Sequence, residues 1–434
     1  MTVQQTVTAI DPAAIRAFSE QAQEPSWLTD MRLQAWETYH KLPVPKLEKT
    51  DLSKRKLDYF ELYLGNQKDS LVQLPGQLPS LFRLADENQS FIFSKNGDVL
   101  RGNIQNSLQA QGVIYTDLRT AAQTYESLVK PYLGQMVKVE DDKFAALNAA
   151  VWGSGVFLYV PRNMQVEVPL QAFFWENEER AGMFTRVLIV VEEGASVTYI
   201  DGYQGEQSGD ALHVGVVEVY VKANASVQYH SIQNNASNMN NLVYRQAQVD
   251  RDGSIDWNIG ELGDGFTVAY NKTVLDGQGS KSDTKVITVG NGRQQLDLTC
   301  HTIHVGKHSE SDMMVRGVMR DRAKAVYRGN TQILKGASGS NGQQEENLLL
   351  LSPKAIADAI PMLLIDENDV KCGHAASVGK INAEQLYYLM SRGISREDAE
   401  KLIIFGFLDP VIVNIPLDGV QHAMKELIER KLMR

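Results

Sequence analysis

Short runs of β-branched and aromatic residues alternate with small turn clusters between about residues 156 and 342. Two such runs, Val187–Val191 and Val197–Ile200, flank the first cluster. Branched and aromatic side chains fit the half-buried surface of a sheet, and the glycines and asparagines of the clusters provide the backbone freedom that tight turns need. The pattern therefore predicts a β-rich core of short strands joined by tight turns.

The turn clusters recur at a nearly constant interval. They end in Ser196, Ser226, Ser254, Ser280, Ser309 and Ser338, and subtracting successive positions gives 30, 28, 26, 29 and 29 residues. Such a period, with two strands per repeat, is typical of a stacked array in which each repeat buries its apolar face against the next. We expect a parallel β-helix (solenoid), and a large sandwich of tandem hairpins is the alternative.

Helical patterns precede the repeat. Asp11, followed by proline, can cap a first helix, and a second amphipathic pattern begins near Ser26. A helix is expected over Thr116–Leu133 and another over Lys143–Val151, and Asn96 with Gly97 favours a two-residue hairpin turn. These patterns predict an α-rich region on the N-terminal side.

Helical patterns also follow the repeat. A strand-like segment, Val370–Val378, leads to Asn382, which can cap a helix. Ser395 opens the next helix, which Gly406 is expected to close, and the last helix covers about Gly419–Met433. The expected organisation is an N-terminal lobe at 1–150, a β-helix core at 151–380 and a helical, partner-docking region at 381–434.

Composition and charge exclude several classes of function. The 434 residues carry a formal charge of -10, which disfavours a nucleic-acid or anionic-membrane partner. Two cysteines cannot form a disulfide framework, and neither a secretion signal nor a membrane-spanning run is present, so we expect a cytoplasmic protein. The phosphate-binding Gly-x4-Gly-Lys-Ser/Thr loop and the Gly-x-Ser-x-Gly nucleophile elbow are both missing from the sequence.

Two groups of histidine and cysteine residues are candidate metal sites. The first contains Cys300, His301, His304 and His308. On a strand Cys300 and His301 point to opposite faces, so we interpret Cys300 as a buried apolar residue rather than a ligand.

Cys372 and His374 form the second group. They are two residues apart on a strand-like segment, so they share a face and can reach one metal ion or one interface. Packing on a buried face remains the alternative. The Tyr387, Tyr388, Phe405 and Phe407 cluster has the same two interpretations, as core or as an interface.

At these residues the sequence resembles the SufB/SufD family of the Suf iron–sulfur cluster assembly system. The segments that carry the resemblance are Glu24–Trp27, Gln295–Leu298 with His304, Asn347–Leu350, Asp369–Ile381, Gln385–Ile394 and Ala399–Phe407. Ala375 stands where the SufB pattern has a glutamate, and Leu364 where an acidic residue is common, so the chain is more similar to SufD than to SufB.

The resemblance implies a right-handed parallel β-helix between α-helical ends. It further implies a subunit without turnover chemistry of its own, in complex with a SufB-like paralogue and a SufC-like ABC ATPase. His374, and with it Cys372, would contact iron or a nascent cluster transiently at the paralogue interface, with no permanently bound cofactor. The implied partner-binding residues are Tyr387, Tyr388, Arg392, Gly393, Phe405 and Phe407.

Three alternatives remain open. The chain could act as a SufB-like scaffold in a homodimer, or form a homodimer when isolated from its complex. A carbohydrate-active β-helix enzyme, from a different class, should show a carboxylate cluster and exposed aromatic residues along one face of the solenoid.

Overall fold

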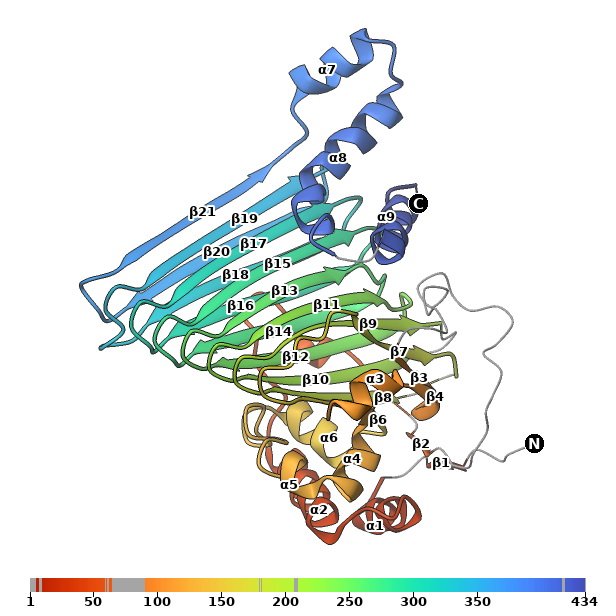
Figure 1. Cartoon of the computed structure of the whole chain (residues 1–434). Helices are drawn as coiled ribbons and strands as arrows, with labels where there is room; N and C mark the ends of the chain where they lie inside the picture. Colours follow the sequence, from red (N-terminus) through yellow and green to blue (C-terminus); the bar gives the residue numbers. More distant parts are fainter. Residues whose placement is uncertain are drawn as a thin grey trace.

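The computed structural model describes residues 5–7, 10–58, 60, 62–64, 90–178, 180, 182–206, 210–415 and 418–433. Within these residues two sheets stack face to face, and helices lie at both ends of the stack (Figure 1). From Ser154 onward the chain alternates between the sheets, so that each strand there pairs with a strand two positions away in sequence. A separate two-stranded sheet consists of β1 (Gln5–Val7) and β2 (Leu62–Leu64).

The first sheet has nine strands in the described part of the chain. In spatial order they are β20 (Ile356–Ile365), β18 (Lys324–Ile333), β16 (Gln295–His304), β14 (Phe266–Leu275), β12 (Met239–Val249), β10 (Ala211–Val221), β8 (Gly182–Val191), β6 (Ser154–Val160) and β5 (Ile114–Asp117).

The second sheet has ten strands over the same described residues. Their order is β21 (Lys371–Gly379), β19 (Asn341–Leu350), β17 (Glu310–Met319), β15 (Lys281–Gly290), β13 (Ser254–Glu261), β11 (Ser226–Asn234), β9 (Ser196–Gly205), β7 (Leu170–Glu176), β3 (Phe91–Lys95) and β4 (Asp98–Asn103).

Strand pairing within the repeat is parallel, which confirms the predicted solenoid and excludes the hairpin sandwich. The separation of paired residues ranges from 26, for Asn240 with Phe266, to 32, for Lys324 with Ile356. Every predicted turn cluster holds one residue with a positive φ, and these are Gly194, Asn224, Asp252, Gly279, His308 and Gly336. The recurring turn residues therefore set the period, because each coil needs one left-handed residue there.

The interior of the solenoid changes from apolar to partly polar along its axis. Val187 and Val217 are register neighbours in the apolar part, and the next residue in that column is Arg245. Arg245 forms an ion pair with Glu261 at 2.9 Å, and both side chains are buried. Nearby, burial raises the pKa of Asp201 to about 6, although hydrogen bonds from Ser231 and Tyr229 oppose this shift.

The N-terminal helices cover one end of the solenoid (Figure 1). They are α1 (Pro12–Gln21), α2 (Ser26–Lys41), α3 (Asn106–Ala110), α4 (Leu118–Thr124), α5 (Glu126–Val129) and α6 (Lys143–Val151), with a 3-10 turn at Leu52–Lys54. Glu24 forms a buried ion pair with Arg32 at 2.7 Å, and Arg32 also donates to the carbonyls of Ala150 and Trp152. This network joins α2 to the end of α6, which leads into the first coil.

The N-terminal region has the predicted helix cap and hairpin turn, but one predicted helix begins as a strand. Asp11 caps α1, and the Asn96-Gly97 turn joins β3 to β4 with positive φ at both residues. The prediction of helix throughout Thr116–Leu133 is wrong at its start, because Thr116 belongs to β5, which pairs with β6. Hydrogen bonding thus crosses residue 150, while the predicted domain boundaries at 150 and 380 stay a prediction.

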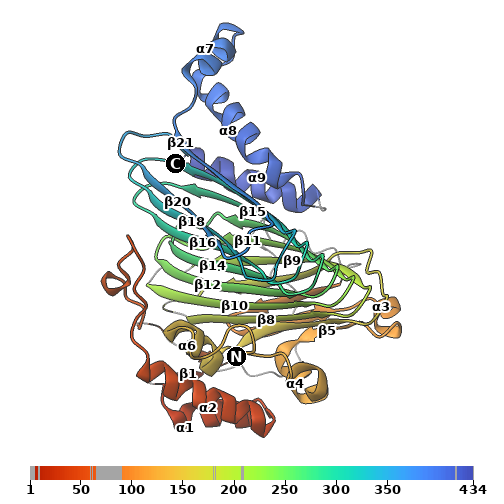
Figure 2. The same ribbon diagram turned by 90° about the vertical axis from the view of Figure 1, so that its left-hand side faces the viewer.

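Residues 43–56, which we call the strap, run from α2 along the outside of the first sheet (Figure 2). Arg55 donates to Gln295 of β16 at 2.9 Å, and Lys49 forms an ion pair with Asp358 of β20 at 3.2 Å. The strap therefore connects the N-terminal helices to the opposite end of the solenoid.

Three helices follow β21: α7 (Ala383–Ser391), α8 (Arg396–Ile412) and α9 (Asp418–Met433). Asn382 and Ser395 cap α7 and α8 as predicted. The prediction that Gly406 closes its helix is wrong, because α8 continues to Ile412. Leu408, Val411 and Ile412 are buried beyond the glycine, and this burial outweighs the roughly 1 kcal/mol cost of an interior glycine.

Helix α9 and the end of α8 pack on the outer face of the second sheet, whereas α7 and the start of α8 project away from it (Figure 1). None of the described helices is both long and apolar enough to cross a membrane.

Candidate functional site

Cys372 and His374 lie on the interior-facing side of the last strand, β21. In the register with β19, Cys372 pairs with Gly342 and His374 pairs with Gln344. Gly342 and Gln344 are buried between the sheets, so their partners on β21 face the same interior. Because no further coil follows, this interior is open to solvent at β21.

The two side chains differ in exposure. His374 is exposed, and Cys372 is half-buried. Burial raises the pKa of Cys372, although the backbone N–H of Gly373 acts in the opposite direction. The thiol is thus mostly protonated at neutral pH and would lose its proton on binding a soft metal ion.

Thiolate and imidazole are suitable ligands for iron and iron–sulfur species. In the described part of the chain, no group of three or more His, Cys, Asp or Glu side chains is arranged to hold a metal ion. Cys372 and His374 could therefore provide only part of a coordination sphere, and a metal ion bound there would need further ligands from another molecule.

The first histidine and cysteine group is dispersed. Cys300 is buried in the interior, where burial raises its pKa to about 12. His304 is also buried, with Ser309 and Ser311 each 2.8 Å from its ring nitrogens. His301 faces the other side of the sheet and contacts the Tyr270 hydroxyl at 3.1 Å. This arrangement confirms the interpretation of Cys300 as an interior residue.

Around Cys372 and His374, the open end of the solenoid combines apolar side chains with unpaired strand edges. Within the described chain β20 pairs with β18 alone and β21 with β19 alone, so one edge of each is free. Leu364 is 48% exposed and Val378 is 45% exposed, and Ile356, Met362 and Ile365 are exposed as well. Free edges with apolar side chains are the features that another sheet can pair with.

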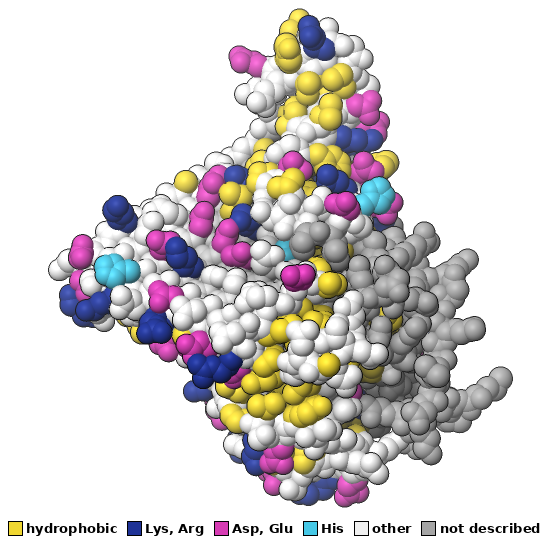
Figure 3. Space-filling model, in the orientation of Figure 1, with side chains coloured by type: hydrophobic (Ala, Val, Ile, Leu, Met, Phe, Trp, Pro, Cys, Tyr) yellow, Lys and Arg dark blue, Asp and Glu magenta, His cyan; other side chains and the backbone are white. Residues whose placement is uncertain are grey.

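Helix α7 and the start of α8 form an exposed apolar projection. Tyr387 is 74% exposed and Tyr388 is 59% exposed, and no residue of α7 is buried. Arg392 ends α7, with its guanidinium 5.9 Å from the Tyr388 ring, and Gly393 at φ +87° allows the tight link to α8. Figure 3 shows hydrophobic side chains gathered along this projection.

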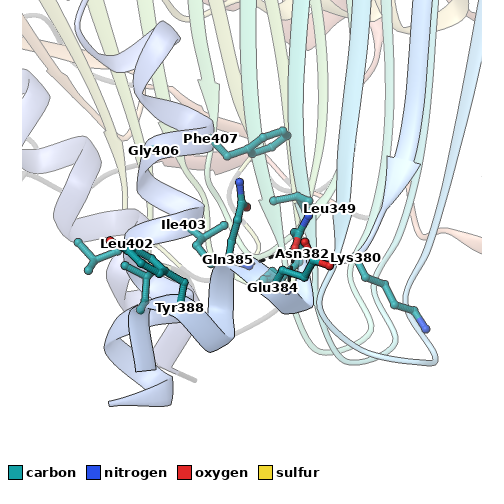
Figure 4. A pocket seen from close by; sticks show the side chains of 12 residues that line it. Leu349, Lys380, Asn382, Glu384, Gln385, Tyr388, Leu402, Ile403, Gly406 and Phe407 are labelled. Carbon is teal, nitrogen blue, oxygen red and sulfur yellow. Dashed lines mark hydrogen bonds between the residues drawn. The ribbon is translucent and has the colours of Figure 1, made fainter. Parts of the chain in front are cut away.

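A groove of about 770 Å³ lies between α7, α8 and the end of β19. Tyr388 and Leu402 line one end, and Leu349 and Phe407 line the part nearer the sheet (Figure 4). Phe405 and Phe407 are half-buried and pack on the apolar cluster beneath α8, and Arg316 lies 5.3 Å from the Phe407 ring. The structure thus brings Tyr388 and Phe407 to one groove, while Tyr387 faces outward.

Sequence reasoning missed Leu402 and Ile403, which line the groove together with Gly406. Their spacing of one helical turn from Gly406 was a usable signal. An apolar stripe that faces a core has the same spacing, so the sequence alone does not separate the two.

Comparisons with known proteins show which family the chain belongs to. The family described as "SUF system FeS cluster assembly, SufBD core domain" matches residues 173–407, and "SufBD protein N-terminal region" matches residues 18–172. The chain is 40% identical over 432 residues to the iron-sulfur cluster assembly protein SufD of Bacillus subtilis, covering 98% of this chain and 99% of that protein.

Staphylococcal relatives are more distant. An iron-sulfur cluster assembly SufBD family protein of Staphylococcus haemolyticus is 34% identical over 415 residues, covering 93% of this chain and 89% of the relative. A Staphylococcus aureus protein of the same description has the same identity and coverage. Because both family regions and a full-length relative match, the chain belongs to the SufB/SufD family of iron–sulfur cluster assembly proteins and is most like SufD.

Proposed function

We propose that this chain is the SufD-like subunit of a cytoplasmic iron–sulfur cluster assembly complex. In this proposal it binds a SufB-like paralogue at the open end of the solenoid and a SufC-like ABC ATPase at α7 and α8. The chain itself performs no turnover chemistry, and ATP is hydrolysed by the partner. Full-length similarity to a SufD protein supports the assignment, and the missing phosphate-binding loop is consistent with it.

The proposed paralogue interface rests on the free edges of β20 and β21, the strands on which Leu364 and Val378 are exposed. A second solenoid of the same family would present similar strands. Edge-to-edge pairing would satisfy the free backbone groups and cover the apolar side chains at once. This favours a partner with a sheet over a helical or unstructured one.

Iron or a nascent cluster would be bound transiently at this interface. Cys372 and His374 offer one thiolate and one imidazole from this chain, and the paralogue would provide the remaining ligands. Because its ligands come from two chains, such a cluster can be released when the subunits separate or shift. The cluster is then the product of the complex and not a resident cofactor of this subunit.

The ATPase would dock on the projection formed by α7 and α8. Tyr387 and Tyr388 are exposed there, and the groove beside them is large enough for an aromatic or aliphatic anchor. These exposed aromatic side chains do not pack in the core of this chain, so contact with a partner is the role that fits them. A helical face of the partner is the element that fits between α7 and α8.

The experiment that tests the paralogue interface is co-purification with charged variants at the open end. Val378→Asp and Leu364→Asp place a carboxylate on the apolar surface, and each should abolish co-purification of the SufB-like subunit while the thermal unfolding midpoint stays unchanged. Val44→Asp, at an exposed position in the strap, is the matched control and should retain the partner. Wild-type chain recovered solely as a homodimer would contradict the heterocomplex and favour the scaffold alternative.

A further inference from the structure

A second cavity lies far from the open end, between the first sheet and the N-terminal region. Its volume is about 360 Å³, within the range of small-molecule sites. The floor is the outer face of β12, β14 and β16, and the roof comes from the strap and from residues 137–142. No residue of the proposed cluster or ATPase sites lines it.

The strand register arranges the floor as a grid. Tyr244 of β12 pairs with Tyr270 of β14, which pairs with Thr299 of β16. On one side of this row lie Leu242 and Val268, with Asp297 next to Val268. On the other side Gln246 pairs with Lys272. Aromatic side chains thus occupy the centre of the floor, with an acid and a base at opposite ends.

Asp297 provides an unfilled hydrogen-bond acceptor. Its side chain is 1% exposed and lines the cavity. One carboxylate oxygen accepts from Arg328, whereas the other has no hydrogen-bond partner among the described residues. A buried carboxylate oxygen without a partner costs free energy, so a bound donor at this position would be favourable.

Lys272 provides the complementary cation. It lines the same cavity and forms no ion pair with any described residue. Together with burial, which is the larger effect, Lys272 lowers the pKa of His301 beside it. The ammonium group is therefore close enough to act on its neighbour and is free to bind an acid.

The other two acids of the cavity are already engaged or lie at its rim. Asp142 accepts from the Phe144 amide at 2.6 Å and from the Tyr244 hydroxyl at 2.8 Å. Asp141 is exposed and accepts from the Lys138 amide at 3.0 Å. Two groups of the cavity interior thus lack a partner among the described residues: one carboxylate oxygen of Asp297 and the ammonium of Lys272.

We propose that this cavity binds a flat aromatic molecule that has an acidic group at one end and an N–H donor at the other. The acidic group would lie against Lys272, and the N–H donor would lie against Asp297. The ring would be enclosed by the two tyrosines of the floor on one side and by Leu47, Leu52 and Val137 of the roof on the other. Lys272 is four residues from Val268, the register partner of Asp297, which is about 13 Å along the strand. This is a separation of backbone positions, and a ligand of two fused rings with its polar groups at opposite ends is of matching length.

The test uses 6-amino-2-naphthoate, which has this shape and is itself fluorescent, titrated into the full-length chain. Val268→Trp fills the cavity and should abolish binding. Lys272→Gln breaks no described ion pair, and it should weaken binding at least about tenfold, the effect of losing one charged hydrogen bond. 2-Naphthoate, which lacks the amino group, should bind more weakly than the amino compound to the wild type.

Two controls separate this site from other surfaces. Gln228→Trp adds the same side chain at an exposed position on β11 and should leave binding unchanged. Tyr388→Ala alters the groove at α7 and should also leave binding unchanged. The proposal is overturned if the wild type does not bind the probe at millimolar concentration, if Lys272→Gln binds as well as wild type, or if Tyr388→Ala removes the binding.

Discussion

Glu346 reaches across the interior of the solenoid to the backbone of Gly329. A Cβ atom at position 329 would lie 2.4 Å from Oε1 of Glu346, so the carboxylate occupies the space that the glycine leaves. Glu346 is 1% exposed, and no hydrogen bond of good geometry reaches either carboxylate oxygen within the described residues. Burial raises its pKa to about 7, although the backbone of Gly329 acts to lower it.

Replacing Glu346 by Gln should stabilise the fold more at high pH than at low pH. The folded pKa, about 7, is above the ordinary value of 4.5, so the folded state binds more protons than the unfolded state between these values. The contribution of protonated Glu346 to the stability of the fold is fully present below about pH 4.5. It is lost as the pH rises through 7, because the buried side chain then becomes charged. Glu346→Gln removes this loss.

Unfolding of both proteins at pH 5 and pH 9 measures the effect. We expect the stability difference between variant and wild type to grow at pH 9 by on the order of a few kcal/mol. An equal difference at the two pH values would mean that the carboxylate is hydrated or paired in the folded protein.

Tyr388→Ala should weaken co-purification with the SufC-like ATPase and leave the unfolding midpoint unchanged. The side chain is exposed and lines the groove between α7 and α8, so its removal takes contact area from a partner and little from the chain itself. Affinity capture followed by thermal unfolding gives both readouts.

Leu408→Ala, on the neighbouring helix α8, is the matched core variant. Leu408 is fully buried, so its truncation should cost about 2–5 kcal/mol of folding free energy. If Tyr388→Ala lowered stability to a similar extent, the projection would be part of the core and the docking proposal would fail.

His374→Ala should lower the iron and labile sulfide recovered with the assembled complex. An exposed imidazole contributes little to folding, so complex formation and stability should persist while the ligand set loses one member. Metal analysis and sulfide determination on purified complexes measure the change. His422→Ala, at an exposed histidine of α9, is the control, and equal iron and sulfide content in both variants would contradict the ligand assignment.

Gly406→Ala should stabilise the chain by about 0.5–1 kcal/mol, because alanine loses less backbone entropy than glycine inside a helix. No atom lies within 4 Å of the position that its Cβ would take, so the substitution causes no clash. Chemical unfolding of the variant checks the sign. A loss of stability would indicate that α8 is interrupted at Gly406, as the sequence pattern suggested.

Much of the fold was predictable because its signals are local. The recurring turn residues predicted the period, since each coil requires a left-handed residue at one place, and Asp11, Asn382 and Ser395 each cap the expected helix. Gly406 was misinterpreted because the apolar residues beyond it are buried against another part of the chain. The helix propensity of a residue does not depend on such long-range contacts, so it does not predict them.

The candidate site was predictable only in part. The two-residue spacing of Cys372 and His374 placed them on one face, and this follows from strand geometry alone. Their position at the open last coil was not visible in the sequence, because a strand with one neighbour has the same local pattern as a strand with two. Likewise, Leu402 and Ile403 could be recognised as groove residues only after α7 and α8 were seen to leave the sheet.

The sequence by itself therefore determined the period, the helix caps and the family. These depend on turn residues, alternation and motifs that interact within a few positions of each other. The tertiary structure decided which surfaces stay uncovered: the free edges of β20 and β21, the projecting tyrosines, and the cavity where Lys272 and Asp297 lie without full partners. Exposure depends on which distant segments pack together, and the contribution of each residue to it cannot be calculated from its neighbours in the chain.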